Sequence, residues 1–211
     1  MIRYRYFEES IEAGIFVRNI SVESTCVFTL PNLLTASRLV LAPVVAWRLL
    51  EHDVQGAFWW FVIAAITDLL DGNLARWLNQ RSVLGAWLDP IADKVMLLTT
   101  LSMLALTGLL PMWLLFIVLV RDGVILAGAE AYRRLTGKLD VRPTISGKVA
   151  TFLEFVLVSW VLAEIALDLG LAYAIEPLAM LTALAVGGSG LRYVWLWARK
   201  TTAFLREQTH E

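Results

Sequence analysis

Apolar residues along this chain are gathered into six long stretches, each separated from the next by a short polar segment. The stretches approach the ~20 residues that an α-helix needs to cross the hydrocarbon core of a bilayer. We therefore predict an all-α integral membrane protein built as a bundle of six transmembrane helices. The predicted helices cover residues 33–50, 57–77, 84–106, 111–133, 145–167 and 177–197.

The composition of the chain agrees with a membrane protein. Hydrophobic residues make up 58% of the 211 positions, and the mean hydropathy of +0.67 argues against a soluble domain. The chain has no internal repeat or linker, so residues 31–200 are expected to form one membrane domain, followed by a tail at 201–211. Residues 1–30 are either an interfacial helix at the headgroup surface or a flexible lead-in. The single Cys26 excludes a disulfide within the chain, and no nucleic-acid partner is expected.

The placement of basic residues predicts how the chain is oriented in the membrane. The net charge of −1 says little, but the connections near 51–56, 107–110 and 168–176 contain no Lys or Arg. The other connections and the two terminal segments contain many. Because cytoplasmic segments are enriched in Lys and Arg, both termini are expected on the cytoplasmic side. The expected location is a bacterial inner membrane.

Four aspartates lie close together in sequence, at or near the ends of two predicted helices. Asp68 and Asp71 are three residues apart, and Asp89 and Asp93 are four apart, so each pair shares one face of a helix. A turn signal at 79–82 separates the pairs, and a helical hairpin folded there would bring them together. The alternative is that these are solvated charges at helix ends, but ionisable residues within membrane segments are usually functional.

Clustered carboxylates at a membrane boundary are costly unless a positive charge neutralises them. Arg76 and Arg81 offset part of the charge, but they cannot fill a site built of carboxylate oxygens. A hard divalent cation can, and Mg²⁺ or Mn²⁺ suits Asp ligands that handle phosphate. The small residues Gly72, Ala75 and Gly85 would let a bulky anionic ligand approach the backbone closely.

The spacing of these residues resembles the signature of the CDP-alcohol phosphatidyltransferase family. The pattern is Asp68-x-x-Asp71-Gly72-x-x-Ala75-Arg76, eight residues, then Gly85-x-x-x-Asp89-x-x-x-Asp93, and all eight fixed positions match. The resemblance implies an enzyme of phospholipid biosynthesis that transfers a phosphatidyl group from CDP-diacylglycerol to an alcohol and releases CMP.

The resemblance also implies roles for individual residues. Two Mg²⁺ or Mn²⁺ ions would be held by the four aspartates, Asp68, Asp71, Asp89 and Asp93. Asp93 would also act as general base on the acceptor hydroxyl. The implied CDP-diacylglycerol contacts are Leu30, Pro31, Asn32, Leu33, Gly72, Ala75, Arg76, Ser82 and Gly85. On the sequence alone, Pro31 only marks a helix start, and Ser82 is equally well a helix N-cap.

Three cations on different predicted helices are candidates for binding an anionic acceptor. They are Arg121, Lys148 and Arg192, and charge-assisted hydrogen bonds to phosphate would favour such an acceptor. Their alternative role is to neutralise Asp122, Glu154 and the motif aspartates. Arg38 likewise is either a phosphate ligand or a charge that snorkels to the interface.

The identity of the acceptor stays open at this point. Phosphatidylglycerol, which gives cardiolipin, and glycerol 3-phosphate, which gives phosphatidylglycerophosphate, both qualify. The segment 142–148 and Arg121-Asp122 resemble the cardiolipin branch of the family slightly more. The same chemistry with inositol phosphate or serine is the alternative.

Two other classes of membrane protein also use buried carboxylates. A polyprenyl aromatic transferase would need a second Asp-rich motif and roughly three more spans. A transporter would show inverted internal symmetry and acidic residues spread over several spans, whereas four of them cluster here. The small residues at 187–190 allow close helix contact, either within the bundle or across an expected homodimer.

Overall fold

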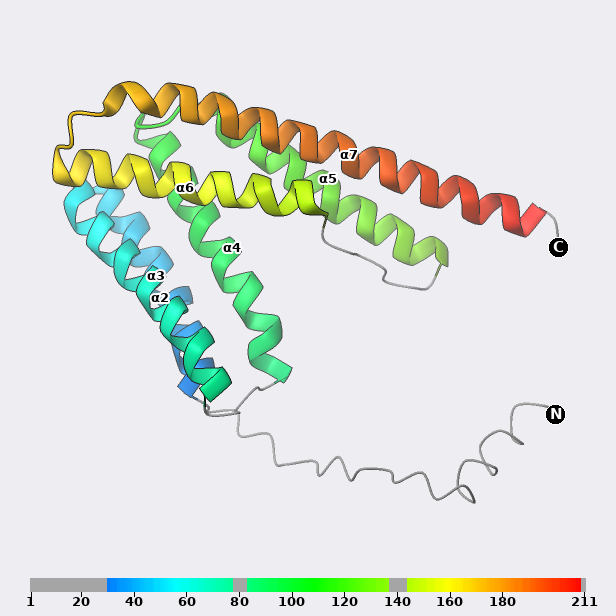
Figure 1. Cartoon of the computed structure of the whole chain (residues 1–211), viewed down its shortest axis with the longest axis horizontal. Coiled ribbons are helices and arrows are strands. Elements are labelled where there is room, and N and C mark those ends of the chain that lie inside the picture. Colours follow the sequence, from blue (N-terminus) through cyan, green and yellow to red (C-terminus); the bar gives the residue numbers. More distant parts are fainter. Residues whose placement is uncertain (1–29, 78–82, 137–143, 210–211) are drawn as a thin grey trace, which may run out of the picture.

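The computed structural model describes the main chain of residues 30–77, 83–136 and 144–209, and the side chains of 37–68, 91–134, 144–199 and 202. Within these ranges the chain forms six α-helices and one short 3-10 helix, with no strand (Figure 1). They are α2 (Leu30–Leu50), α3 (Val54–Trp77), α4 (Val83–Leu106), α5 (Met112–Thr136), α6 (Ile145–Leu167), η1 (Ala172–Ala174) and α7 (Ile175–Thr209). The predicted N-terminal interfacial segment lies outside the described residues.

The six helices confirm the number and order that the apolar pattern predicts. The observed and predicted bounds differ by only a few residues, except at the end of α7, which continues to Thr209 instead of ending at 197. Residues 198–209 are rich in Ala, Arg, Lys, Glu and Gln, which favour helix without apolar character. An apolar pattern therefore marks where α7 can lie in lipid, but not where the helix ends.

Three of the described helical segments are long and apolar enough to cross a membrane. They are Met112–Arg134, Ile145–Leu167 and Ala172–Arg199. The side chains of α3 are described as far as Asp68, and within them the apolar part is the shorter segment Val54–Asp68. The chain is thus a helical membrane protein, and six complete crossings stay a prediction.

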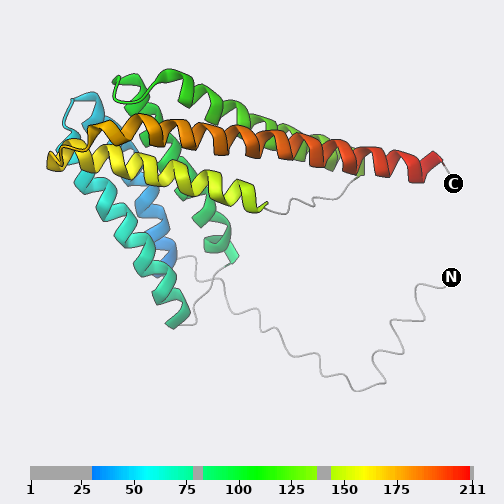
Figure 2. The same cartoon turned by 45° about the horizontal axis from the view of Figure 1, so that its top comes forward.

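The helices form two groups of three. α2 packs against both α3 and α4, and α7 packs against both α5 and α6. The groups are joined mainly through α3 and α6, while α4 meets α5 and α6 over a short stretch. Figures 1 and 2 show the groups side by side at the end that carries the connections 51–53, 107–111 and 168–174, and diverging toward the other end.

The core lies at the end where the groups meet. Side chains of both groups are fully buried there, among them Val45, Leu49, Leu104, Leu157 and Val161. Close α5–α7 packing depends on a glycine, because a Cβ at Gly128 would lie 2.8 Å from Trp197. Many large apolar side chains point outward, including Phe116, Leu184 and Leu191. Such a surface suits lipid rather than water.

Candidate active site

A cavity of about 1020 Å³ opens where the two helix groups diverge, and all six α-helices contribute to its lining. One part of the wall is apolar and includes Phe61, Met96, Ile125, Phe152 and Phe155. Charged side chains form another part: Arg38, Asp68, Asp93, Lys94, Arg121, Asp122 and Lys148. A cavity with both an apolar and a charged wall suits an amphipathic ligand.

Arg38, Asp68 and Asp93 form the first charged group, which we call the Arg38 cluster. The Nη1 atom of Arg38, on α2, lies 2.6 Å from Oδ1 of Asp68 on α3 and also contacts Oδ1 of Asp93 on α4. Arg38 is only 2% exposed, so it does not snorkel to the interface. The two carboxylates are about half exposed toward the cavity.

The predicted meeting of the two aspartate pairs is borne out for Asp68 and Asp93, but through a third helix. Their oxygens converge on one nitrogen atom, so the two carboxylates must lie close together. The sequence predicted a hairpin of two helices, whereas the structure places α2 against both of them and supplies Arg38. Three helices therefore contribute to the Arg38 cluster: α3 and α4 supply the carboxylates, and α2 supplies the guanidinium.

The Arg38 cluster can be tested for its fit to a divalent cation. Two carboxylates face one guanidinium, so a net negative charge remains, and hard cations bind such oxygens. Among the residues whose side chains are described, no three acidic, His or Cys side chains come together. The side chains of Asp71 and Asp89 lie outside that set. The carboxylates of Asp68 and Asp93 therefore fit as part of the ligand set of a metal site.

Other predicted site residues also lie outside the described side chains. Asp71, Gly72, Ala75 and Arg76 are on α3, and Gly85 and Asp89 on α4, but only their helical main chain is described. The same holds for Leu30, Pro31, Asn32 and Leu33, which open α2. Pro31 does lie in the first turn of a helix, as predicted. Ser82 lies outside the described residues altogether.

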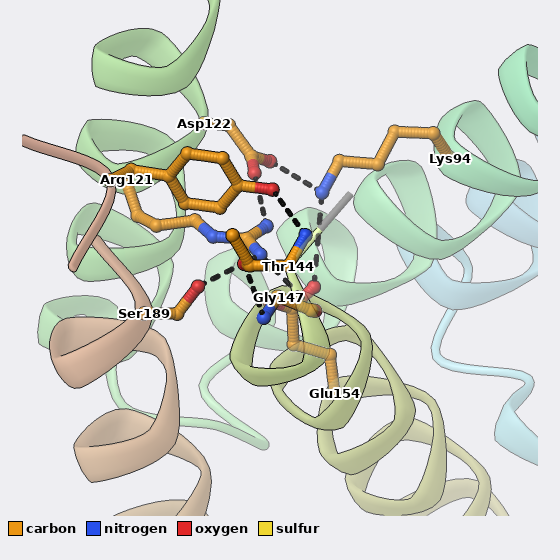
Figure 3. Close-up of polar contacts among 8 residues, drawn as sticks. Lys94, Arg121, Asp122, Thr144, Gly147, Glu154 and Ser189 are labelled. Atoms are coloured by element: carbon orange, nitrogen blue, oxygen red, sulfur yellow. Dashed lines mark hydrogen bonds and ion pairs between the residues drawn. The ribbon is translucent and has the colours of Figure 1, made fainter. Parts of the chain in front are cut away.

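Lys94, Arg121, Asp122 and Glu154 form a second charged group, the Lys94 cluster (Figure 3). Lys94 Nζ lies 2.6 Å from Asp122 Oδ2 and 4.0 Å from Glu154 Oε2. Arg121 Nη1 donates to Asp122 Oδ1 at 2.8 Å. Two cations thus face two carboxylates, and Glu154 is only 1% exposed. Mutual neutralisation is the condition under which such charges are tolerated in an apolar interior.

Arg121 also ties three helices together. Its Nη2 atom donates to the Gly147 carbonyl on α6 and to Ser189 Oγ on α7, both at 3.3 Å. Ser189 is buried at this contact, and Gly190 packs beside Arg121, since a Cβ there would be in ordinary van der Waals contact with the Arg121 Cγ atom at 3.4 Å. The small stretch at 187–190 is therefore used within the bundle at these positions. The described residues give no support for the predicted homodimer.

The N-terminus of α6 forms a third part of the cavity wall. Thr144 caps the helix, because its Oγ1 accepts from the Gly147 N–H at 3.1 Å. The Tyr193 hydroxyl accepts from the Thr144 N–H at 3.2 Å. A Cβ on Gly147 would lie 3.3 Å from Tyr193, so this position is tight. Lys148 follows directly and faces the cavity.

The three predicted acceptor cations occupy different environments. Arg121 is buried and paired with Asp122, as the charge-neutralising alternative expects, although it also lines the cavity. Lys148 is exposed and lines the cavity. Arg192 is exposed on α7 and is not among the lining residues. The structure thus brings Arg121 and Lys148 to one cavity and places Arg192 outside its lining.

Sequence reasoning missed two cavity residues, Lys94 and Tyr193. Lys94 directly follows the motif residue Asp93, in a helix otherwise apolar enough to enter lipid. An isolated cation in such a helix is itself a sign of function or of a buried partner. Tyr193 gives no such sign, because tyrosine is common near membrane interfaces.

The helical fold defines an integral membrane protein, and its cavity has a partly apolar and partly charged wall. The chain belongs to the CDP-alcohol phosphatidyltransferase family, whose model matches residues 28–187. It is therefore a member of a transferase family, and such enzymes generally depend on a divalent metal.

Several similar proteins carry the name cardiolipin synthase (CMP-forming). The Homo sapiens protein is 31% identical over 196 residues, covering 85% of this chain and 65% of that protein. A probable cardiolipin synthase of Drosophila melanogaster is 35% identical over 203 residues, covering 84% and 60%. The Streptomyces coelicolor protein is 35% identical over 142 residues, covering 64% and 66%. The chain thus spans less than two thirds of the human and Drosophila relatives.

Proposed function

We propose that this protein transfers a phosphatidyl group from CDP-diacylglycerol to a hydroxyl of phosphatidylglycerol, giving cardiolipin and CMP. The observation that carries the proposal is the convergence of Asp68 and Asp93 on one point of the cavity wall. Both occupy fixed positions of the family motif, and they come from helices that a third helix joins. Glycerol 3-phosphate is the second candidate acceptor.

The four motif aspartates are proposed as ligands for two Mg²⁺ or Mn²⁺ ions. The negative excess of the Arg38 cluster supports this for Asp68 and Asp93. When bound, the cations would neutralise the pyrophosphate of CDP-diacylglycerol and stabilise the leaving CMP. The predicted nucleotide contacts at Gly72, Ala75, Arg76, Ser82 and Gly85, and at 30–33, are part of the same proposal.

Asp93 is proposed as the general base. Its carboxylate is about half exposed toward the cavity, and contact with Arg38 holds it in place. It takes the proton of the acceptor hydroxyl while the hydroxyl oxygen forms a bond to the β-phosphorus, the one that carries the diacylglycerol. The bond from that phosphorus to the bridging oxygen breaks, and its electron pair leaves with CMP.

Two observations favour a lipid acceptor over a soluble one. The similar proteins named above are cardiolipin synthases. In addition, the cavity has an apolar wall with Leu126 and Phe152 exposed by 72% and 64%, which would suit acyl chains reaching in from the bilayer. Lys148 lines the same cavity, which supports its pairing with the phosphodiester of the acceptor.

The basic connections suggest which side of the membrane the cavity faces. Asp68, Asp93 and Lys148, which line it, lie in the halves of α3, α4 and α6 that are away from the connections lacking Lys and Arg. The positive-inside rule therefore favours a cytoplasmic site in a bacterial inner membrane. This suits the reaction, because CMP is water-soluble while the diacylglycerol chains stay in lipid.

The test is a defined reaction with purified protein. Labelled CDP-diacylglycerol and Mg²⁺ are offered with phosphatidylglycerol, glycerol 3-phosphate, inositol phosphate or serine separately, and the lipid products are resolved. We expect cardiolipin and CMP with phosphatidylglycerol, and no CMP release when a chelator removes divalent cations. Product from another acceptor alone would overturn the choice of acceptor, and full activity in excess chelator would overturn the metal site.

A further inference from the structure

Lys94 occupies an unusual position, because it directly follows the proposed base and yet points to the other helix group. Successive residues of an α-helix are about 100° apart around the axis. Asp93 therefore contacts Arg38 on α2, while Lys94 reaches Asp122 on α5 and approaches Glu154 on α6. Figure 3 shows the Lys94 ammonium between these two carboxylates. Neighbouring side chains thus hold α4 from two sides.

The partner of Lys94 is itself firmly held. Asp122 accepts from Arg121, and Arg121 also donates to the Gly147 carbonyl and to Ser189. These contacts connect α5, α6 and α7 around the carboxylate that Lys94 binds. The ion pair with Asp122 therefore links Lys94, and with it α4, to the whole group formed by α5, α6 and α7. We call this link the tether.

This tether lies where the two groups have few other contacts. α4 packs mainly against α2 and meets α5 and α6 over a short stretch. Both Lys94 and Asp122 line the cavity between the groups. An ion pair of 2.6 Å across such a gap constrains the separation of α4 from α5, because the attraction between the two charges weakens as they move apart.

We propose that Lys94 is a positioning residue for the reaction proposed above, on which this inference rests. By pairing with Asp122, Lys94 holds α4 against the group formed by α5, α6 and α7. Asp93, on α4, is thereby kept at a fixed distance from Lys148, on α6, and faces the acceptor. The competing role is direct binding of a substrate phosphate by the Lys94 ammonium. The two roles differ in whether Asp122 matters and in which kinetic parameter changes.

The kinetic test is a double-mutant cycle with Lys94→Met, Asp122→Asn and the combined variant. In each single variant the base should be misplaced, which should lower kcat by about ten- to a hundredfold. The KM for CDP-diacylglycerol should change by less than about threefold, which is well below a tenfold change in affinity. The combined variant should match the worse single variant, because the two residues act as one pair. Lys94→Arg, which keeps the charge, should restore most of kcat.

Controls separate this role from simple loss of structure. Arg48→Met breaks another partly exposed ion pair, between Arg48 and Asp53 at 2.9 Å, away from the cavity, and should leave kcat unchanged. Lys94→Gln replaces Lys94→Met if the latter is not monodisperse in detergent. Two outcomes would overturn the proposal: losses that multiply in the combined variant, or a raised KM with normal kcat.

A second readout does not depend on activity. Spin labels at Ile91→Cys on α4 and Val120→Cys on α5, both exposed, report the distance between the groups once Cys26, the single cysteine, is replaced by Ser. We expect Lys94→Met to lengthen or broaden this distance distribution relative to Lys94. An unchanged distribution would refute the tether. A wild-type protein that releases no CMP would instead refute the proposed reaction, and the distance measurement would still decide on the tether.

Discussion

The Arg38 cluster and the Lys94 cluster lie on the walls of one cavity but differ in charge balance and exposure. The Arg38 cluster sets two half-exposed carboxylates against one buried guanidinium. The Lys94 cluster has two cations and two carboxylates, and only the Lys94 side chain is substantially exposed. Excess negative charge that faces a cavity is suited to a cationic ligand, whereas a balanced, buried cluster is suited to joining helices.

The largest effect should follow from removing the carboxylate of Asp93. Asp93→Asn keeps the size of the side chain but cannot accept the acceptor proton, so kcat should fall by about 10²–10⁴-fold, the usual range for a general base. The KM for CDP-diacylglycerol should change much less. Steady-state CMP release at saturating acceptor measures both parameters. A variant that loses CDP-diacylglycerol binding instead would show that Asp93 is chiefly a metal ligand.

The other carboxylate of the Arg38 cluster should behave differently. Asp68→Asn removes a ligand charge but not the base, so the Mg²⁺ concentration for half-maximal activity should rise by roughly tenfold, equivalent to about 1.4 kcal/mol. A Mg²⁺ titration of CMP release checks this, with Asp53→Asn, at the opposite end of the molecule, as the control. Equal Mg²⁺ dependence in Asp68→Asn and wild type would remove Asp68 from the proposed metal site.

Substitution of Arg38 tests whether the Arg38 cluster also stabilises the fold. Arg38→Gln leaves Asp68 and Asp93 facing each other without the guanidinium. The free energy of unfolding should fall by roughly 1.5–3 kcal/mol, the range for a hydrogen bond to a charged group. Adding Mg²⁺ should restore more thermal stability in Arg38→Gln than in wild type, because the cation replaces the lost positive charge. Equal stabilisation of the two proteins by Mg²⁺ would contradict binding of the metal at the carboxylates that Arg38 contacts.

The comparison also shows what the sequence could predict. The helices follow from the length of the apolar stretches, and the approach of Asp68 to Asp93 follows from motif spacing around a turn. Both depend on residues near one another in the chain. The family motif adds the chemistry, because its fixed spacing is specific.

The rest depends on packing between distant helices, which spacing does not encode. Lys94 and Asp122 are on different helices of different groups, and no periodic pattern links them. The snorkelling alternative for Arg38 could be excluded only by its burial against α3 and α4. Similarly, Lys148 and Arg192 look equivalent in sequence, because lipid-facing and cavity-facing sides of a membrane helix are both largely apolar.

Lys148 and Arg192 test the acceptor side of the cavity, and Arg192 gives the smallest expected effect. Lys148 lines the cavity, so Lys148→Ala should raise the KM for phosphatidylglycerol by about tenfold or more, since a charge-assisted hydrogen bond contributes about 1.5–3 kcal/mol. Arg192 was predicted to share this role, but it is exposed outside the cavity lining. Arg192→Ala should therefore change that KM less than Lys148→Ala does.

The KM for CDP-diacylglycerol serves as the internal control for both variants, because its pyrophosphate is assigned to the motif aspartates at the Arg38 cluster. It should stay close to the wild-type value in Lys148→Ala and Arg192→Ala alike. If Arg192→Ala raises the phosphatidylglycerol KM as strongly as Lys148→Ala, the acceptor headgroup must extend beyond the cavity lining toward α7. If neither variant changes it, the apolar wall rather than a cation selects the acceptor, and substitution of Phe152 becomes the decisive experiment.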